Sequence, residues 1–225
     1  MDFDFSDDQL QLRDAVAKGV EKGYTFERRR AITAAGGFSR EAYKELAELG
    51  LAGLYISDAD GGLNMGPVEG MVVMEELGRG MVLEPLAQTL LASGVIGAYG
   101  SAEVKAAWLP AIASGEKLVV LAHQERKARY RLDRCEAQAT AAGGGWTVTG
   151  TKHVVPAGDH ADAFLVPAVA NGQVALFLVE RGAAGVSTRG YLTQDEGRAA
   201  DVTLANAPAT LVTADGQTAL EHAVD

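Results

Sequence analysis

The hydrophobic pattern of this sequence changes period near residue 116, and that change constrains the fold more than any other feature. Before residue 116, apolar residues such as Leu12, Val16 and Val20 recur at near-helical spacing. After it, short apolar runs alternate with glycine-rich turns, a pattern typical of strands. The sequence therefore predicts an α+β protein of several domains, in which an all-α bundle precedes a β-domain.

Five helices are predicted in the first part of the chain from their start and stop signals. Ser6 and Gln9 form a capping box, and Ser39 is the N-cap of the second helix. Pro67 stands at the first position of the third, where proline is well tolerated. The expected helices cover residue 7 to the late twenties, 40–49, 67–78, 86–98 and 102–113.

Eight strands are predicted in the second part. Asn171 and Gly172 separate two apolar runs and are the strongest hairpin signal, because both residues tolerate the left-handed conformation of a type I′ turn. Short strands at this spacing favour an antiparallel barrel or sandwich. The expected strands are 118–124, 135–142, 146–149, 153–155, 163–169, 173–180, 186–192 and 201–205.

Helical periodicity returns at the end of the chain, where Leu220 and Val224 stand four residues apart. A short helix without a packing partner is marginal, so we expect further sequence to follow; a frayed natural C-terminus is the alternative. The predicted domains are a helical domain at 1–115, a β-domain at 116–213 and the start of a C-terminal helical domain at 214–225.

The charge and cysteine content exclude several classes of protein. The net charge is −10, which argues against nucleic-acid binding. The longest apolar candidate, 81–99, is interrupted by Glu84 and Pro85, so no membrane span is expected. The single cysteine, Cys135, cannot form an intramolecular disulfide, and the acidic N-terminus is not a signal peptide. We therefore expect a reducing compartment and assign the protein to the cytoplasm.

Local motifs alone name no reaction. The sequence has no P-loop, no GxGxxG fingerprint and no GxSxG elbow. Its histidines show no metal-ligand spacing, and no metal site is predicted.

Four stretches of the chain carry a likeness to a known family, in the right order. They are FSDDQLQLRDAV (5–16), GLAGLYISDADGGLNMGPVEGMVVMEELGRG (50–80), WTVTGTKHVVPAGDHADAFLVPA (146–168) and LFLVERGAAGV (176–186). Together they resemble the N-terminal and middle domains of the acyl-CoA dehydrogenases. That family joins a helical domain, a β-domain and a C-terminal four-helix domain, the last of which is expected to be missing here.

The resemblance implies FAD-dependent α,β-dehydrogenation of an acyl-CoA thioester. In the family a glutamate removes the α-proton and the β-hydride passes to the flavin. The usual base lies on the C-terminal helices, so no catalytic residue is expected in this chain, and 225 residues alone should be inactive. The implied partners are an acyl-CoA substrate, an electron-transfer flavoprotein or similar acceptor, and further subunits in a homo- or hetero-oligomer, a dimer or a tetramer.

One family motif, T-E-P-x-x-G-S-D, follows the first strand of the β-domain and aligns here with QERKARYR (124–131). Gln124 takes the threonine position and keeps a donor and an acceptor, while Glu125 is retained. The resemblance implies that both contact the cofactor. Tyr130 takes the serine position, so Tyr130 and Arg131 are the implied substrate contacts.

A second family motif, G-x-K-x-W-I-T, aligns on Gly150 and Lys152. It places Val154 at the aromatic position against the flavin, followed by Val155 and by Pro156 at the threonine position. These three residues are the further implied cofactor contacts. Because proline lacks both a hydroxyl and an N–H group, it cannot donate a hydrogen bond there.

These departures resemble the small-subunit type of pimeloyl-CoA and steroid-side-chain dehydrogenases, which work as heteromers. The enzymatic hypothesis therefore competes with a second one, in which the chain is a non-catalytic partner that shapes the acyl pocket of a flavin-bearing subunit. A free-standing CoA-binding module is a third, weaker hypothesis.

A basic cluster follows the strand predicted at 118–124 and comprises Arg126, Lys127, Arg129 and Arg131. Guanidinium groups match phosphate in bidentate fashion, so the cluster can bind FAD or CoA phosphates. Contact with a partner subunit and a solvated loop balanced by nearby acids are the alternatives.

Overall fold

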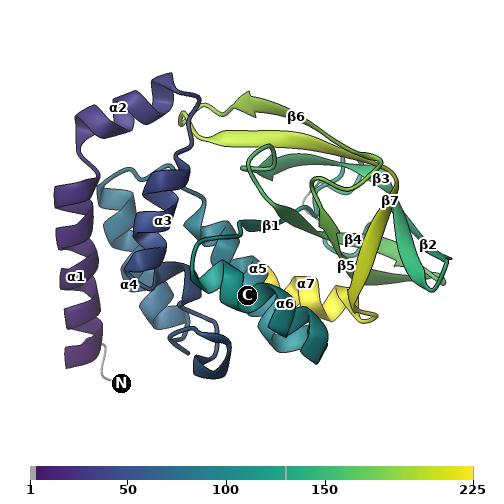
Figure 1. Ribbon diagram of the computed structural model, residues 1–225, viewed down its shortest axis with the longest axis horizontal. Helices are drawn as coiled ribbons and strands as arrows, with labels where there is room; N and C mark the ends of the chain where they lie inside the picture. Colours follow the sequence, from purple (N-terminus) through teal and green to yellow (C-terminus); the bar gives the residue numbers. More distant parts are fainter. Residues whose placement is uncertain (1–3, 130, 225) are drawn as a thin grey trace.

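Helices occupy the first half of the chain and strands most of the second half, which confirms the predicted α+β class (Figure 1). The computed structural model describes residues 4–129 and 131–224. The helices are α1 (Asp7–Gly23), α2 (Phe26–Ala34), α3 (Arg40–Glu48), α4 (Pro67–Arg79), α5 (Leu86–Tyr99), α6 (Ala102–Ala113) and α7 (Gly216–Val224), with short 3-10 turns at Leu51–Gly53 and Asp58–Asp60. Among the described residues, no helix combines the length and the apolar character that crossing a membrane requires.

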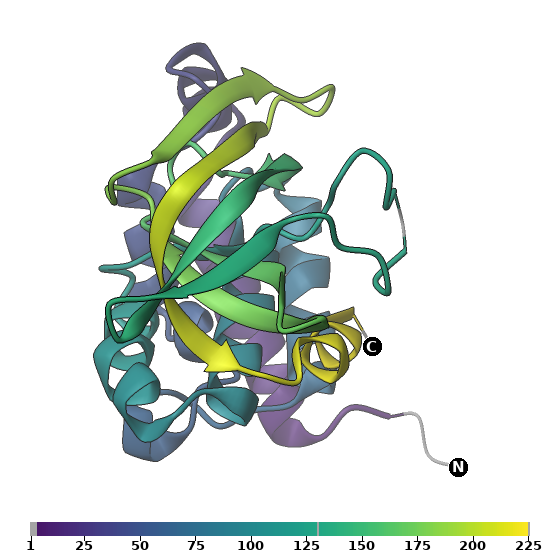
Figure 2. The ribbon, with the colours of Figure 1, turned by 90° about the vertical axis from the view of Figure 1, so that its right-hand side faces the viewer.

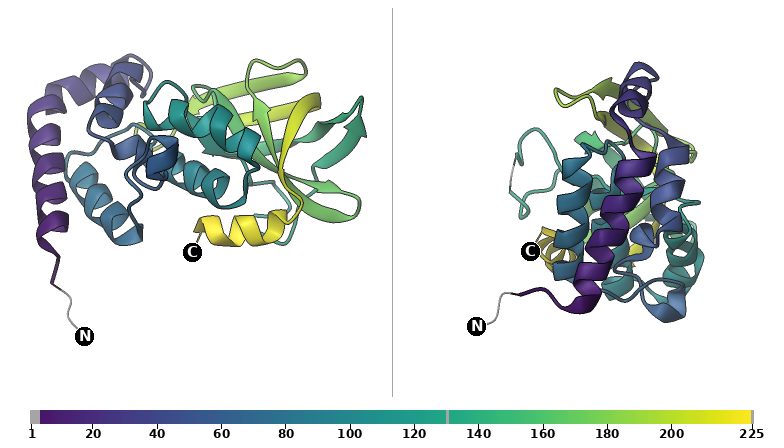
Figure 3. Two further views of the ribbon diagram at one scale, coloured as in Figure 1. Left: turned by 60° about the horizontal axis from the view of Figure 1, so that its bottom comes forward. Right: turned by 90° about the vertical axis from the view of Figure 1, so that its left-hand side faces the viewer.

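The predicted helix starts are confirmed, whereas one predicted helix end is wrong. Ser6 and Gln9 cap each other, and Ser39 accepts from the N–H of Ala42. The first helix does not run into the late twenties: α1 ends at Gly23 and α2 begins at Phe26. Thr25 separates them, because its extended backbone and its hydroxyl, which accepts from Arg28, start a new helix. α1 and α4 then pack side by side (Figure 3).

The strands form a barrel with two additions. They are β1 (Val119–Leu121), β2 (Gln138–Ala142), β3 (Gly145–Pro156), β4 (Ala163–Ala170), β5 (Gln173–Glu180), β6 (Val186–Leu192) and β7 (Arg198–Thr213). The order β4–β5–β7–β3–β2 closes through one pairing of Gln138 with Val169, which joins β2 to β4. β6 extends β7 and β1 extends β4. Most pairs are antiparallel as predicted, but β1 and β2 both run parallel to β4.

The strand boundaries differ from expectation around the candidate site. β1 ends at Leu121 rather than 124, so Gln124 lies in a loop, and β2 begins at Gln138 rather than 135. The strands expected at 146–149 and 153–155 are one strand, β3, and the short strand expected at 201–205 is the middle of β7. Gly150 does not interrupt β3, because the missing side chain lets the strand pass close to Ala137, where a Cβ would lie 2.7 Å from the alanine methyl group.

The hairpin predicted at Asn171 and Gly172 is confirmed. It joins β4 and β5, with Ala170 paired to Gln173. Both turn residues have positive φ angles, 51° and 83°, as a type I′ turn requires.

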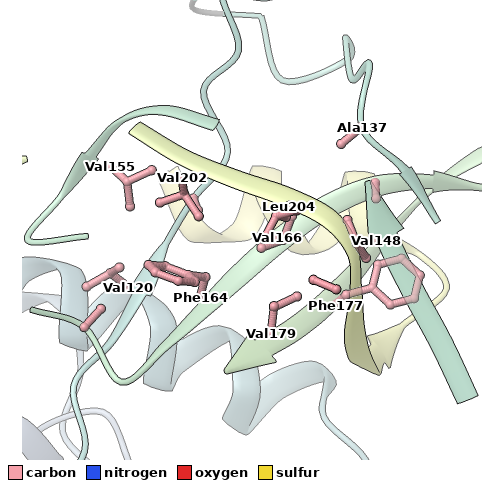
Figure 4. Close-up of a cluster of buried hydrophobic side chains, with 14 of the residues drawn as sticks. Val120, Ala137, Val148, Val155, Phe164, Val166, Phe177, Val179, Val202 and Leu204 are labelled. Carbon is pink, nitrogen blue, oxygen red and sulfur yellow. The ribbon is translucent and has the colours of Figure 1, made fainter. Parts of the chain in front are cut away.

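Side chains fill the barrel interior, and helices cover the outer surface of the barrel at β4 and β5. Phe164 and Phe177 lie inside with small and branched residues from the surrounding strands (Figure 4). The alternate residues of β4 and β5, such as Leu165 and Leu178, face α5, α6 and α7 instead. Because both faces of β4 are buried, its sequence reads as a continuous apolar run rather than an alternating one.

Ion pairs and hydrogen bonds join the helical part to the barrel. Arg29 on α2 contacts Glu196 at 2.7 Å, in the turn between β6 and β7. Arg40 on α3 pairs with Asp162 at 3.2 Å, and that carboxylate also accepts from the backbone N–H of Leu118. Phe38 stacks on His160 beside this pair. These contacts fix the loop that enters β1 against the first helices.

Glu84 is a buried acid at the connection between α4 and α5. Its Oε1 accepts from the N–H of Ser39 at 3.1 Å, while its Oε2 is buried with no hydrogen-bond partner among the described residues. Burial raises the pKa of this carboxyl above its ordinary value of 4.5. An acid with a raised folded-state pKa destabilises the fold progressively as pH rises above the unfolded value.

Glu84→Gln should therefore stabilise the protein at neutral pH by about 1 kcal/mol, because the amide keeps the acceptor for Ser39 and removes the buried charge. Urea denaturation at pH 7 and pH 4 measures this. The gain should shrink at pH 4, where Glu84 is neutral, and Glu48→Gln at an exposed position serves as the control. A gain of equal size at both pH values would contradict the assignment.

Candidate functional site

The candidate site is built on a fully buried ion pair between Glu125 and Lys152. Lys152 is 0% exposed and Glu125 is 3% exposed. The Lys152 Nζ lies 2.6 Å from Glu125 Oε1 and 2.7 Å from the carbonyl oxygen of Pro167. The N–H groups of Glu136 and Ala137 donate to the two carboxylate oxygens. The pair therefore ties the loop after β1 to β3, to β4 and to the segment that enters β2.

The charge state of Glu125 follows from these contacts. Burial alone would raise the pKa of its carboxyl, but the Lys152 ammonium and the two N–H donors hold it below the ordinary value. Cys135 lies beside the pair, with Sγ 3.8 Å from Lys152 Nζ and 3.2 Å from the oxygen of Pro167. Burial raises the pKa of this thiol, so it is a packing residue rather than a reactive one.

A β-bulge in β3 lies between Lys152 and Val155 and contains His153 and Val154. Lys152 pairs with Val202 and Val155 with Ala200, so two residues of β3 lie opposite the single residue Asp201. Val154 stands in this bulge with φ 51° and is 49% exposed. A branched residue in the left-handed region is strained, and strain of this kind gathers at functional sites.

Together, the loop and the bulge form a pocket of about 440 Å³. Its walls are Gln124, Glu125, Arg126, Arg129, His153, Val154 and Asp201. Figure 2 shows the long loop between β1 and β2 extending at one side of the barrel. The main chains of the two motifs are joined here, since the N–H of His153 donates to the oxygen of Gln124 at 2.9 Å.

The carboxylates that line this pocket are already neutralised. Asp201 contacts Arg189 at 2.6 Å and the Nδ1 of His153 at 3.0 Å. The hydrogen bond from Arg189 lowers the pKa of Asp201, and the bond from His153 adds to this. Glu125 is paired with Lys152. Both are held as anions, so neither is poised to take a proton.

The pocket brings together three of the implied cofactor contacts, Gln124, Glu125 and Val154. Pro156 and Val154 also line a neighbouring cavity of about 260 Å³ between the barrel and the helical part. Val155 is 1% exposed in the barrel core. The side chains of Glu125 and Val155 are thus buried, the first against Lys152 and the second in the barrel core.

Arg131, one of the two implied substrate contacts, does not line the pocket. Arg131 is exposed and forms an ion pair with Asp133, its near neighbour in sequence. Tyr130 lies outside the described residues. Their role remains a prediction.

Lys152, His153 and Asp201 were not recognised as parts of the site from sequence. In the sequence, Lys152 serves only to align the second family motif, together with Gly150. A lysine inside a predicted strand region, two residues before Val154 and Val155, together with the retained Glu125 of the preceding motif, was the available signal for a buried ion pair. No sequence pattern predicted that Asp201 belongs to the site, because Asp201 reaches the pocket only through the pairing of β3 with β7.

Comparison with known proteins identifies the family of this chain. Residues 6–116 match the family model of the acyl-CoA dehydrogenase N-terminal domain. The chain belongs to the acyl-CoA dehydrogenase family. Acyl-CoA dehydrogenase FadE27 of Mycobacterium tuberculosis is 31% identical over 157 residues, covering 69% of this chain and 41% of FadE27.

Solved structures of the acyl-CoA dehydrogenase family share the fold. A variant of the Tcur3481–Tcur3483 steroid ACAD superposes with a TM-score of 0.88 at 29% identity, covering 96% of this chain and 59% of that chain. The ChsE4–ChsE5 complex from Mycobacterium tuberculosis gives a TM-score of 0.87 at 28% identity, covering 98% and 60%. This chain therefore spans about two fifths of the length of FadE27 and about 60% of the two matched structures.

Lys152→Met should destabilise the protein by about 3–5 kcal/mol, because it leaves the buried carboxylate of Glu125 without its counter-ion. Urea denaturation at pH 7 measures the loss. The double variant with Glu125→Gln should lose less than the sum of the single losses, since the two residues interact directly. Additive losses would contradict a coupled pair.

The stabilisation from this pair should also depend on pH with a defined sign. Because the pKa of Glu125 is lowered on folding, its contribution is complete above the ordinary value of 4.5 and is lost as pH falls through the folded-state value. The stability difference between the wild type and Glu125→Gln should therefore narrow in acid.

Val154→Gly should stabilise the protein by about 1 kcal/mol, because glycine adopts a φ of 51° without strain and the lost side chain is half exposed. Thermal unfolding measures the gain. Val148→Gly in the buried part of the same strand should instead destabilise it, and a loss of stability at Val154 would show that the bulge is not strained.

Proposed function

We propose that this chain forms part of an FAD-dependent acyl-CoA dehydrogenase and supplies one wall of its flavin site. The pocket formed by Gln124, Val154 and the loop after β1 carries this proposal. Family membership supports the reaction class. The pocket lies where the two motifs aligned from the sequence, at 124–131 and 150–156, come together.

The residues present fit one side of a flavin ring. Val154 offers a half-exposed apolar surface to a planar heterocycle, and the Gln124 amide can both donate and accept at a polar ring edge. Pro156 supplies no donor. A flavin bound here would accept the hydride that leaves the β-carbon of the acyl-CoA.

The residues of this chain bind and orient rather than exchange protons. The barrel and the Glu125–Lys152 pair hold Gln124 and Val154 on a rigid framework, which is what a positioning role requires. The two pocket carboxylates are engaged as anions, so the base that removes the α-proton comes from another segment or subunit. An electron-transfer flavoprotein or similar acceptor and a dimeric or tetrameric assembly belong to the same proposal.

A second function is favoured by the missing donor at Pro156 and by the neutralised carboxylates. In this alternative the chain is a partner subunit without flavin of its own, and it shapes the acyl pocket of a flavin-bearing sister. Two of the similar structures each carry the names of two proteins, Tcur3481–Tcur3483 and ChsE4–ChsE5. These names support the idea that this chain assembles with an unlike chain.

The visible absorption spectrum of the purified protein tests the proposal, together with anaerobic titration by acyl-CoA. Bound flavin that is bleached by acyl-CoA, in the protein alone or with its partner, is the expected result. Val154→Asp should weaken flavin retention by at least about tenfold, because it places a charge against the ring face.

Lys18→Asp, at an exposed position on α1, is the control and should leave flavin retention unchanged. A colourless chain that supports reduction only of a partner's flavin establishes the second function. No reduction in any combination would overturn both.

A further inference from the structure

Two arginines at the candidate site have no partner within the described chain. Arg126 and Arg129 line the 440 Å³ pocket, and no hydrogen bond or ion pair from a described residue reaches either guanidinium. The rest of the basic cluster behaves differently. Lys127 pairs with Glu136 at 2.8 Å, and Arg131 pairs with Asp133.

Most arginines of this acidic protein contact a carboxylate. Arg30 and Arg134, which do not line the pocket, also lack a hydrogen bond or ion pair to a described residue. The chain carries 20 basic residues against 30 acidic ones, so anionic partners are plentiful. Arg28, Arg29, Arg40, Arg189 and Arg198 all find carboxylates. At the pocket, Lys152 neutralises Glu125 and Arg189 neutralises Asp201. Arg126 and Arg129 therefore leave the pocket with uncompensated positive charge.

The fold holds these arginines at the pocket rather than leaving them on a free tail. The N–H groups of Ala128 and Arg129 both donate to the main-chain carbonyl oxygen of Glu125, at 3.1 and 3.0 Å. Ala128 is 4% exposed and anchors the turn, while the Glu125 carboxylate is fixed by Lys152. The turn thus projects the arginines on either side of Ala128 from a rigid base.

Positive φ angles at residues other than glycine occur at this pocket as well as elsewhere in the described chain, for example at Met81 and Glu196. Arg129 has a φ of 52°, a conformation that is uncommon for a residue other than glycine or asparagine. Val154, which lines the same pocket, is strained in the same way. Two strained residues that face one pocket indicate that its shape is maintained at a cost in stability, as at ligand sites.

We infer that Arg126 and Arg129 bind the diphosphate of a nucleotide ligand. Guanidiniums match phosphate oxygens in bidentate fashion, and the half-exposed Val154 beside them suits an apolar ring. FAD and CoA both join a diphosphate to a heterocycle, so either can be the source. This inference rests on the proposed function, since it names how that site holds its ligand.

Calorimetric titration of the chain tests the inference with five probes: inorganic pyrophosphate, FAD, riboflavin, CoA and pantetheine. The double variant Arg126→Gln/Arg129→Gln should weaken binding of the diphosphate ligands by at least about tenfold and leave riboflavin and pantetheine unchanged. The control is Arg134→Gln, an exposed arginine of the same loop that does not line the pocket. Loss of FAD affinity alone assigns the diphosphate to FAD, and loss of CoA affinity alone assigns it to CoA.

Salt dependence of the wild type gives a second measurement that needs no variant. Affinity for the diphosphate probes should fall as ionic strength rises, and affinity for riboflavin should not. Equal binding by the wild type and the double variant, or an equal loss with Arg134→Gln, would overturn the inference while leaving the proposed function intact. Pyrophosphate binding that depends on the two arginines, combined with no flavin reduction, would support the inference and overturn the proposed function.

Discussion

The buried contact between Glu125 and Lys152 is the interaction on which the candidate site depends. Removing two charges from water is costly, and their attraction offsets that cost only when further hydrogen bonds complete the geometry. Here the N–H groups of Glu136 and Ala137 and the oxygen of Pro167 provide those bonds. The pair therefore does not serve as a reactive centre. It fixes the origin of a loop that would otherwise leave the barrel freely after β1.

The features of the pocket follow from that fixed origin. The loop begins its turn at Glu125, so Gln124 lies on one side of the anchor and the arginines on the other. The bulge in β3 starts immediately after Lys152, and it turns Val154 outward while Val155 returns to the core. One ion pair thus aligns two segments far apart in sequence and spaces the groups that face a ligand. Strain at Arg129 and Val154 is tolerated because the barrel beneath them is closed and well packed.

The chemistry of the pocket is that of binding. Its carboxylates are held as anions by cations of the same chain, and its unpaired groups are cations and an amide. Such a surface has the charge and the hydrogen-bonding groups to suit an anionic or heterocyclic ligand, but its carboxylates are not available as a base. This accords with the proposal that proton abstraction belongs to another segment or subunit.

Sequence alone determined the fold class, most of the helix starts and the Asn171–Gly172 hairpin, because capping, turn chemistry and hydrophobic period act over a few residues. The family motifs also located Gln124 and Val154. What sequence did not determine was the break at Thr25, the continuous run of β3 past Gly150 and the direction of each side chain around the bulge. These depend on register against β7 and on packing, which are set by residues distant in the chain.

Only the tertiary structure decided which charges are used. Arg126 and Arg131 look alike in the sequence, as do Glu125 and Asp133. In the fold, Glu125 is buried against Lys152, Arg131 is neutralised by Asp133, and Arg126 is left to face the pocket. The physical reason is that an ion pair depends on distance and burial in three dimensions, and neither is written in the local order of residues.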